Sequence, residues 1–293
     1  MPLLLFVTLL WAFSFSLIGA YLAGQVDSYF SAMTRTLLAT AIFLPMLQWK
    51  RCNPRTSICL MIIGAIQLGL MYLFYYQSFL LLSVPEVLLF TIFTPLYITA
   101  FQDLLKRQLS IWNLAIAIVA VLGAGVIRWD SPNSHYWLGF AVVQGANLCF
   151  AIGQLAYKQL MHRQQPALPV RQTFAWFFLG ASLVTVFAWL LFGKPLYPQN
   201  SVHWGVLLWL GLAASGLGYF LWNKGATQVS TATLAAMNNA LIPAGLLINL
   251  LIWNRDADLT RLALGGGLIA AAVILNEWRY KKRESSHGEY HST

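Results

Sequence analysis

The chain has 293 residues, of which 59% are hydrophobic and only 9% are charged. Soluble domains carry about 25% charged residues, so this composition excludes a soluble globular protein, and it equally excludes a disordered or collagen-like one. The formal net charge of +9 does not indicate a nucleic-acid-binding protein, because the basic residues fall in short loops and in the C-terminal tail. The composition therefore predicts an all-α polytopic membrane protein.

Ten stretches are apolar and long enough to cross a bilayer, which requires about 20 helical residues. Short loops separate them, and no soluble domain is inserted. The first stretch lacks a basic segment before it, and it is longer than the apolar core of a signal peptide, which has about 7–15 residues. We therefore interpret it as the first transmembrane helix rather than as a cleaved signal peptide. In chain order the predicted spans are 2–22, 30–48, 57–81, 84–105, 111–127, 137–158, 172–192, 204–224, 230–253 and 260–278.

The distribution of Lys and Arg predicts the orientation, because cytoplasmic loops are enriched in both. Of the 18 basic residues, Arg35 lies within a span, which leaves 17 in loops and tail. With the N-terminus inside, 13 of these are cytoplasmic and 4 are external. We therefore expect both termini in the cytoplasm, with residues 281–293 as a polar tail.

The two halves of the chain also resemble each other, although chance similarity between apolar helices is an alternative. Five helices in each half is an odd number, so the second copy would enter the membrane from the opposite side. Secondary transporters use such inverted repeats and hold their substrate near the midplane. We predict a first repeat over 1–135 and an inverted second repeat over 136–280. The matches are Gly64, Gly69, Tyr72 and Ser83 with Gly211, Gly216, Tyr219 and Ser230, each 147 residues apart, and Pro95 with Pro243.

Two side chains of opposite charge, Arg35 and Glu86, lie inside predicted spans near the outer side. Charged groups are costly in a bilayer, so each needs a partner or a function. Helical rise puts them at similar depths, roughly 8 Å and 3–5 Å below the helix starts. One interpretation is a structural ion pair or a snorkelling Arg35. The other makes Arg35 the site of a substrate carboxylate and Glu86 the proton-sensitive group.

Aromatic and amide side chains recur at helical spacing on several predicted spans. Aromatic stripes are more often packing than binding surfaces. Buried amides either bond a neighbouring helix, which contributes about 0.6–2 kcal/mol, or face a wet cavity. If they share a cavity, the candidate substrate-binding residues are Arg35, Tyr72, Tyr76, Trp11, Asn147, Trp176, Tyr219, Asn223, Asn238 and Asn239.

Several segments resemble those of the drug/metabolite transporter superfamily, EamA type, in its carboxylate/amino acid/amine branch. The resemblance covers about residues 3–278. It implies a ten-helix inverted repeat in a bacterial inner membrane, and in particular uptake of biotin. The segments are WAFSFS (11–16), DSYF (27–30), EVLLFT (86–91), TPLYIT (94–99), FAWF (174–177), GYFLWN (218–223), MNN (237–239) and PAG (243–245).

Other functions stay open to different degrees. Many members of the superfamily export amino acids or other metabolites, and nothing in the sequence fixes the direction of transport. Motifs of hydrolases, metalloproteases and nucleotide-binding enzymes are absent, and the five His residues lack ligand spacing. We expect no enzyme activity, no cofactor and no metal, with a small-molecule substrate and the lipid bilayer as partners and an undetermined oligomeric state.

Overall fold

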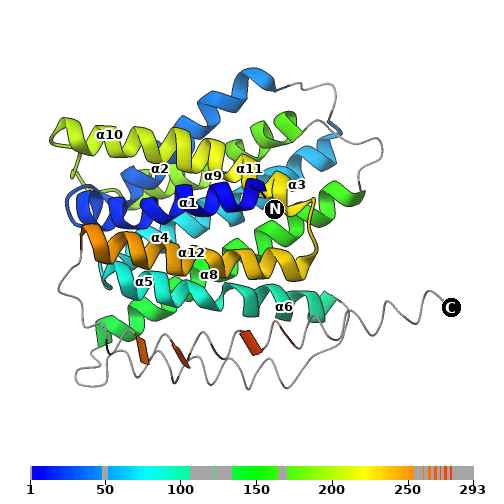
Figure 1. Cartoon of the computed structure of the whole chain (residues 1–293). Helices are drawn as coiled ribbons and strands as arrows, with labels where there is room; N and C mark the ends of the chain where they lie inside the picture. Colours follow the sequence, from blue (N-terminus) through cyan, green and yellow to red (C-terminus); the bar gives the residue numbers. More distant parts are fainter. Residues whose placement is uncertain are drawn as a thin grey trace.

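The structure is a computed structural model that describes residues 2–47, 52–105, 134–163 and 170–253, with isolated positions at 122 and between 260 and 278. Throughout these residues the fold is helical, without a strand, and the long helices lie side by side in one bundle (Figure 1). Helices α1 and α12 begin at the end of the bundle where α6 and α8 end, and α5 and α10 begin at the opposite end (Figure 1).

Several spans are built from consecutive helical pieces. Segments η1, η3 and η5 are π-helical, and η2 and η4 are 3₁₀-helical. The bounds are α1 Pro2–Leu17, η1 Ile18–Leu22, α2 Ser28–Phe43, η2 Leu44–Met46, α3 Pro54–Gly64, η3 Ala65–Leu70, α4 Met71–Ser78, α5 Val84–Phe90, η4 Thr91–Phe93, α6 Thr94–Leu105, α8 Ser134–Arg163, α9 Val170–Phe192, α10 Ser201–Trp209, η5 Leu210–Leu217, α11 Gly218–Ala226 and α12 Thr231–Ile252.

Seven helices in the described residues are long and apolar enough to cross a membrane. They agree with the predicted spans 2–22, 57–81, 84–105, 137–158, 172–192, 204–224 and 230–253 to within a few residues at each end. The predicted span 30–48 appears as α2, which is shorter and carries Arg35. The predicted spans 111–127 and 260–278 and the tail 281–293 fall outside the continuously described ranges, so the count of ten stays a prediction.

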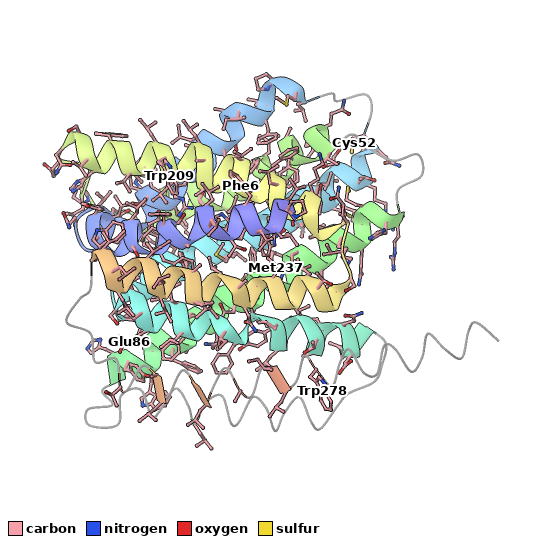
Figure 2. The ribbon with its side chains drawn as sticks, in the orientation of Figure 1. Phe6, Cys52, Glu86, Trp209, Met237 and Trp278 are labelled. Atoms are coloured by element: carbon pink, nitrogen blue, oxygen red, sulfur yellow. The ribbon has the colours of Figure 1, made fainter. Side chains whose placement is uncertain are left out.

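The outside of the bundle is apolar, as a lipid-facing surface requires. Phe6 on α1 is 51% exposed and Phe187 on α9 is 64% exposed. Phe6 lies in the N-terminal half of α1 (Figure 2). A water-soluble protein rarely exposes so much contiguous apolar surface, so the described helices form a multi-pass membrane protein.

Small and hydroxylated residues bring α9 close to its neighbours. A Cβ placed on Gly64 of α3 would lie 1.8 Å from the backbone oxygen of Phe177 on α9, so only glycine fits there. Helix α2 bonds α9 through two pairs of hydroxyl groups, Thr36 with Thr185 and Thr40 with Ser182, each 2.7 Å apart. This packing is typical of membrane helices, where small residues permit close approach and hydroxyls bond between helices.

Two spans share an unusual design. In each, a π-helical segment leads into an α-helix, η3 into α4 and η5 into α11. The π-helical segments end at Leu70 and Leu217, which are 147 residues apart, the spacing of the sequence matches. Turns of π-helix are rare in proteins, and those that occur are often at functional sites. The two π-helical segments therefore point to the tyrosines that follow them, Tyr72 and Tyr219, as candidates for a functional site.

Candidate functional site

A cavity of about 90 Å³ lies in the interior, where helices from both halves of the chain meet. Side chains from α1, η1, α2, α4, η4, α6, α8, α11 and α12 line it. Most of these residues lie near the middle of their spans, so the cavity sits near the centre of the bundle rather than at either end. Six of the predicted substrate-binding residues are among them: Trp11, Arg35, Tyr72, Asn147, Tyr219 and Asn238.

Arg35 projects into this cavity from α2, two turns after the N-cap residue Asp27, whose side chain accepts a hydrogen bond from the N–H of Phe30. Only 2% of Arg35 is exposed. Its guanidinium carbon lies 4.1 Å from the ring centre of Tyr72, a cation–π distance. Among the lining residues that the structure describes, Arg35 is the only one with a charged side chain.

The guanidinium is held by three uncharged hydroxyl groups. Nε donates to Oγ of Ser215 at 3.0 Å, Nη1 to the hydroxyl of Tyr76 at 3.2 Å, and Nη2 to the hydroxyl of Tyr72 at 2.6 Å. Ser215 and Tyr72 also bond each other at 2.7 Å. A guanidinium has five N–H donors. Three are used, so within the described residues one N–H on each terminal nitrogen is available to a ligand.

The ion pair between Arg35 and Glu86 that the sequence suggested is not formed in this structure. Glu86 lies in the first turn of α5, near one end of the bundle (Figure 2). Its Oε2 accepts hydrogen bonds from the backbone N–H and from Oγ of Ser83, both at 2.8 Å. This arrangement is a capping box, which satisfies a backbone donor at the helix start. In this structure Glu86 closes the capping box at the start of α5, while Arg35 binds hydroxyl groups.

On α8, a second polar group faces the cavity. The amide nitrogen of Asn147 donates to the backbone oxygen of Phe90 at 2.8 Å and to Oε1 of Gln144 at 3.1 Å. The Phe90 oxygen is free for this bond because the helix is interrupted at η4. There the N–H of Thr94 bonds the oxygen of Thr91, and Pro95 has no N–H to continue the α-helical pattern.

Aromatic rings form a large part of the remaining wall. The ring of Trp11 lies 4.9 Å from that of Tyr219 and 5.0 Å from that of Trp222. Its indole N–H donates to the oxygen of Ala214 at 2.8 Å. Tyr72 and Tyr219, the tyrosines 147 residues apart, contact each other with their ring centres 6.0 Å apart. These faces suit a flat or fused apolar ring.

The remaining candidates do not line the cavity. Tyr76 stands behind Arg35 as its hydrogen-bond partner. Asn223 exchanges hydrogen bonds with Gln67 at 3.1 and 3.3 Å, so this pair joins η3 to α11. Trp176 on α9 is buried and Asn239 on α12 is partly buried, and both lie outside the lining.

Sequence reasoning missed other residues of the site. Ser215 is one of them, because a serine in an apolar helix carries no signal of its own, and its contact with Arg35 joins residues 180 positions apart. Thr91 and Thr94 were also missed, although the proline beside them marks the break in the helix that brings them to the cavity. Within the described ranges no group of three His, Cys, Asp or Glu is placed to hold a metal ion.

Fold and site together define a polytopic helical membrane protein with a mostly apolar internal cavity, whose described lining includes one buried cation. The sequence matches the EamA-like transporter family over residues 1–129 and again over 137–277. The chain belongs to this family, and it is therefore a transporter rather than an enzyme.

Among curated proteins, the chain is similar to the "Probable biotin transporter" of Pseudomonas aeruginosa, with 54% identity over 285 residues that cover 97% of this chain and 99% of the relative. It is also similar to the "Biotin transporter" of Escherichia coli K12, with 46% identity over 284 residues that cover 96% of this chain and 93% of the relative. A known crystal structure shares the fold, with a TM-score of 0.66 at 17% identity, and covers 97% of this chain and 98% of its own.

Proposed function

We propose that this protein imports biotin across the bacterial inner membrane and that Arg35 binds the carboxylate of biotin. Two relatives that match nearly the whole chain, at 46% and 54% identity, are named as biotin transporters. The observation that carries the proposal is the buried guanidinium on the cavity wall, with uncharged hydrogen-bond partners and two N–H donors left over.

The electrostatics of the cavity favour an anion. A guanidinium stays charged when it is buried, and removing it from water costs several kcal/mol that neutral hydroxyls offset only in part. A substrate carboxylate supplies the missing charge and can accept two parallel hydrogen bonds from the terminal nitrogens. Bound biotin, a monoanion, would bring the net charge of the described cavity to zero.

The same charge balance disfavours amino acids, the alternative substrates. An amino acid carries an ammonium group as well as a carboxylate, so its net charge is zero and the positive charge of Arg35 would stay uncompensated. Among the described lining residues no carboxylate is present to receive the ammonium. Biotin instead presents a neutral ring system, which the rings of Trp11, Tyr72 and Tyr219 suit.

For the transport cycle, we propose alternating access between two inverted repeats, 1–135 and 136–280, with both termini in the cytoplasm. Three observations support the repeats: the family matches the chain twice, the π-helical segments η3 and η5 end 147 residues apart, and Tyr72 contacts its counterpart Tyr219. A pseudo-twofold axis in the membrane plane requires equivalent residues near the axis to meet. The 13-to-4 distribution of basic residues supports the orientation.

We propose that the proton gradient drives uptake and that Glu86 is the proton-sensitive group. Import of an anion is opposed by the negative interior potential, so a co-transported cation is needed for accumulation. Glu86 is a buried carboxylate inside a span. Protonation would remove the negative charge from the carboxyl group that accepts from Ser83. The two hydrogen bonds would be weaker with a neutral acceptor, and this would loosen the start of α5 and permit its movement.

The deciding experiment is uptake of labelled biotin by cells that lack their own biotin synthesis and transport. We expect expression of this chain to produce saturable accumulation at nanomolar external biotin, and dissipation of the proton gradient to abolish it. No uptake, together with new resistance to a toxic amino-acid analogue, would instead identify an exporter.

A further inference from the structure

The amide groups on the cavity wall have a fixed polarity. The atom of Asn147 that faces the backbone oxygen of Phe90 has to be the nitrogen, because a carbonyl oxygen only accepts hydrogen bonds. That nitrogen also donates to Gln144, so both of its hydrogens are used. The opposite atom, Oδ1, has no hydrogen-bond partner within the described residues, although Asn147 is buried and lines the cavity.

A second asparagine repeats the arrangement. The amide nitrogen of Asn238 on α12 donates to the backbone oxygen of Leu234 at 2.8 Å, and the residue lines the same cavity. The same reasoning applies, so the nitrogen faces the helix and Oδ1 is available as an acceptor. Helices α8 and α12 both pack against η4, the interruption of the helix, and these two acceptors therefore flank it.

Gln144 is a second hydrogen-bond partner of Asn147. Its Oε1 accepts from the amide nitrogen of Asn147 and also from the hydroxyl of Tyr97, at 3.2 Å. Rotation of the Asn147 amide would place its oxygen against the backbone oxygen of Phe90, which can only accept, and would lose that bond. Asn147 is thus locked as a hydrogen-bond acceptor toward the cavity.

We infer that Asn147, assisted by Asn238, accepts hydrogen bonds from neutral N–H groups of the substrate, so that the carrier selects carboxylates bearing a urea or amide N–H over similar carboxylates without one. This inference rests on the proposed function and extends it from the carboxylate, bound at Arg35, to the other end of the molecule. Biotin has two such N–H groups in its cyclic urea. A buried acceptor left without a donor is unfavourable, so a substrate that lacks the N–H is rejected.

The test is competition against labelled biotin by three unlabelled compounds. They are biotin itself, an analogue in which oxygen replaces the ring N–H groups, and lipoate, which keeps the five-carbon acid chain and a sulfur-containing ring but has no N–H. For the wild-type protein we expect the oxygen analogue and lipoate to compete at least about tenfold more weakly than biotin, the effect of losing one buried hydrogen bond.

The variant Asn147→Leu keeps the branching of the side chain at Cγ and removes the acceptor, together with the donor to Phe90. We expect it to bind biotin about tenfold more weakly and the oxygen analogue at least as tightly as the wild type does. The analogue makes no hydrogen bond to Asn147, and in the variant it no longer leaves a buried acceptor without a donor. The matched control is Asn249→Leu, another buried amide in the bundle, which bonds Ser16 and does not line the cavity. Its preference for biotin over the analogue should equal that of the wild type.

Two results would overturn the inference. One is a wild-type carrier that takes up biotin but binds the oxygen analogue equally well, a measurement that does not depend on any variant folding. The other is an Asn147→Leu protein whose affinities for biotin and for the oxygen analogue fall by the same factor, which would show that Asn147 only supports the cavity wall. A wild-type protein that takes up no biotin at all would remove the proposed function, and this inference with it.

Discussion

Replacing Arg35 by lysine tests the proposed role of the guanidinium, because it keeps the buried positive charge and removes the planar pair of donors. Lysine offers one ammonium in place of a fork, so at least one of two hydrogen bonds to a substrate carboxylate is lost. The side chain can still lie against the ring of Tyr72, where the guanidinium carbon is now 4.1 Å from the ring centre. We therefore expect the variant to fold and insert.

The magnitude follows from the number of bonds lost. A hydrogen bond to a charged group contributes about 1.5–3 kcal/mol, and 1.4 kcal/mol corresponds to about tenfold in affinity. Loss of one bond should thus weaken biotin binding about 10- to 100-fold. The wild-type protein should discriminate strongly between biotin and its primary amide, which has no charge, and Arg35→Lys should lose much of this discrimination.

The assay compares the concentrations of biotin and of biotin amide that halve the uptake of labelled biotin, with the amount of protein in the membrane measured in parallel. Arg55→Lys is the matched control, because Arg55 is an exposed residue in the first turn of α3 and does not line the cavity. An Arg35→Lys protein that inserts normally and still prefers the acid as strongly as the wild type would refute the assignment of Arg35 to the carboxylate.

Three further predictions concern coupling, packing and topology. Glu86→Gln should keep the capping box, since Gln also closes it, but should lose gradient-driven accumulation while biotin exchange continues; full accumulation would remove Glu86 from the mechanism. Gly64→Ala should sharply lower the amount of folded protein, because the new Cβ meets Phe177 at 1.8 Å, whereas Gly205→Ala, with nothing within 4 Å, should be neutral or slightly stabilising; equal expression of the two would contradict the packing argument. In a cysteine-free background, an impermeant reagent should label single cysteines placed in 128–136 and 194–203 but not in 50–55 and 162–171, and the reverse pattern would end the proposed orientation.

The positions of the described spans were predictable because they depend on local properties. A span such as 84–105 is set by a run of apolar residues long enough for the bilayer, bounded by Ser83 and Pro85 at its start. The interruption at Pro95 was also encoded locally, since a proline has no N–H. The capping box of Ser83 and Glu86 follows a known pattern of serine and glutamate three residues apart. Charge alone suggested that Glu86 pairs with Arg35, whereas in the structure its carboxylate accepts hydrogen bonds from Ser83.

The sequence could not separate residues that face the cavity from those that join helices. Asn223 and Asn238 are chemically identical and both lie within spans, but Asn223 meets Gln67, 156 positions away, and Asn238 meets the cavity. Likewise, Arg35 was recognisable as a costly buried charge, and Tyr72 and Tyr76 were candidates for the substrate site. The sequence did not show that these two tyrosines and Ser215 are the hydrogen-bond partners of Arg35. Composition and helical periodicity thus determined the class of protein and the positions of the described helices. Only the packing of the helices decided which polar group meets which, because those contacts join side chains far apart in the chain and depend on how each helix is rotated against its neighbours.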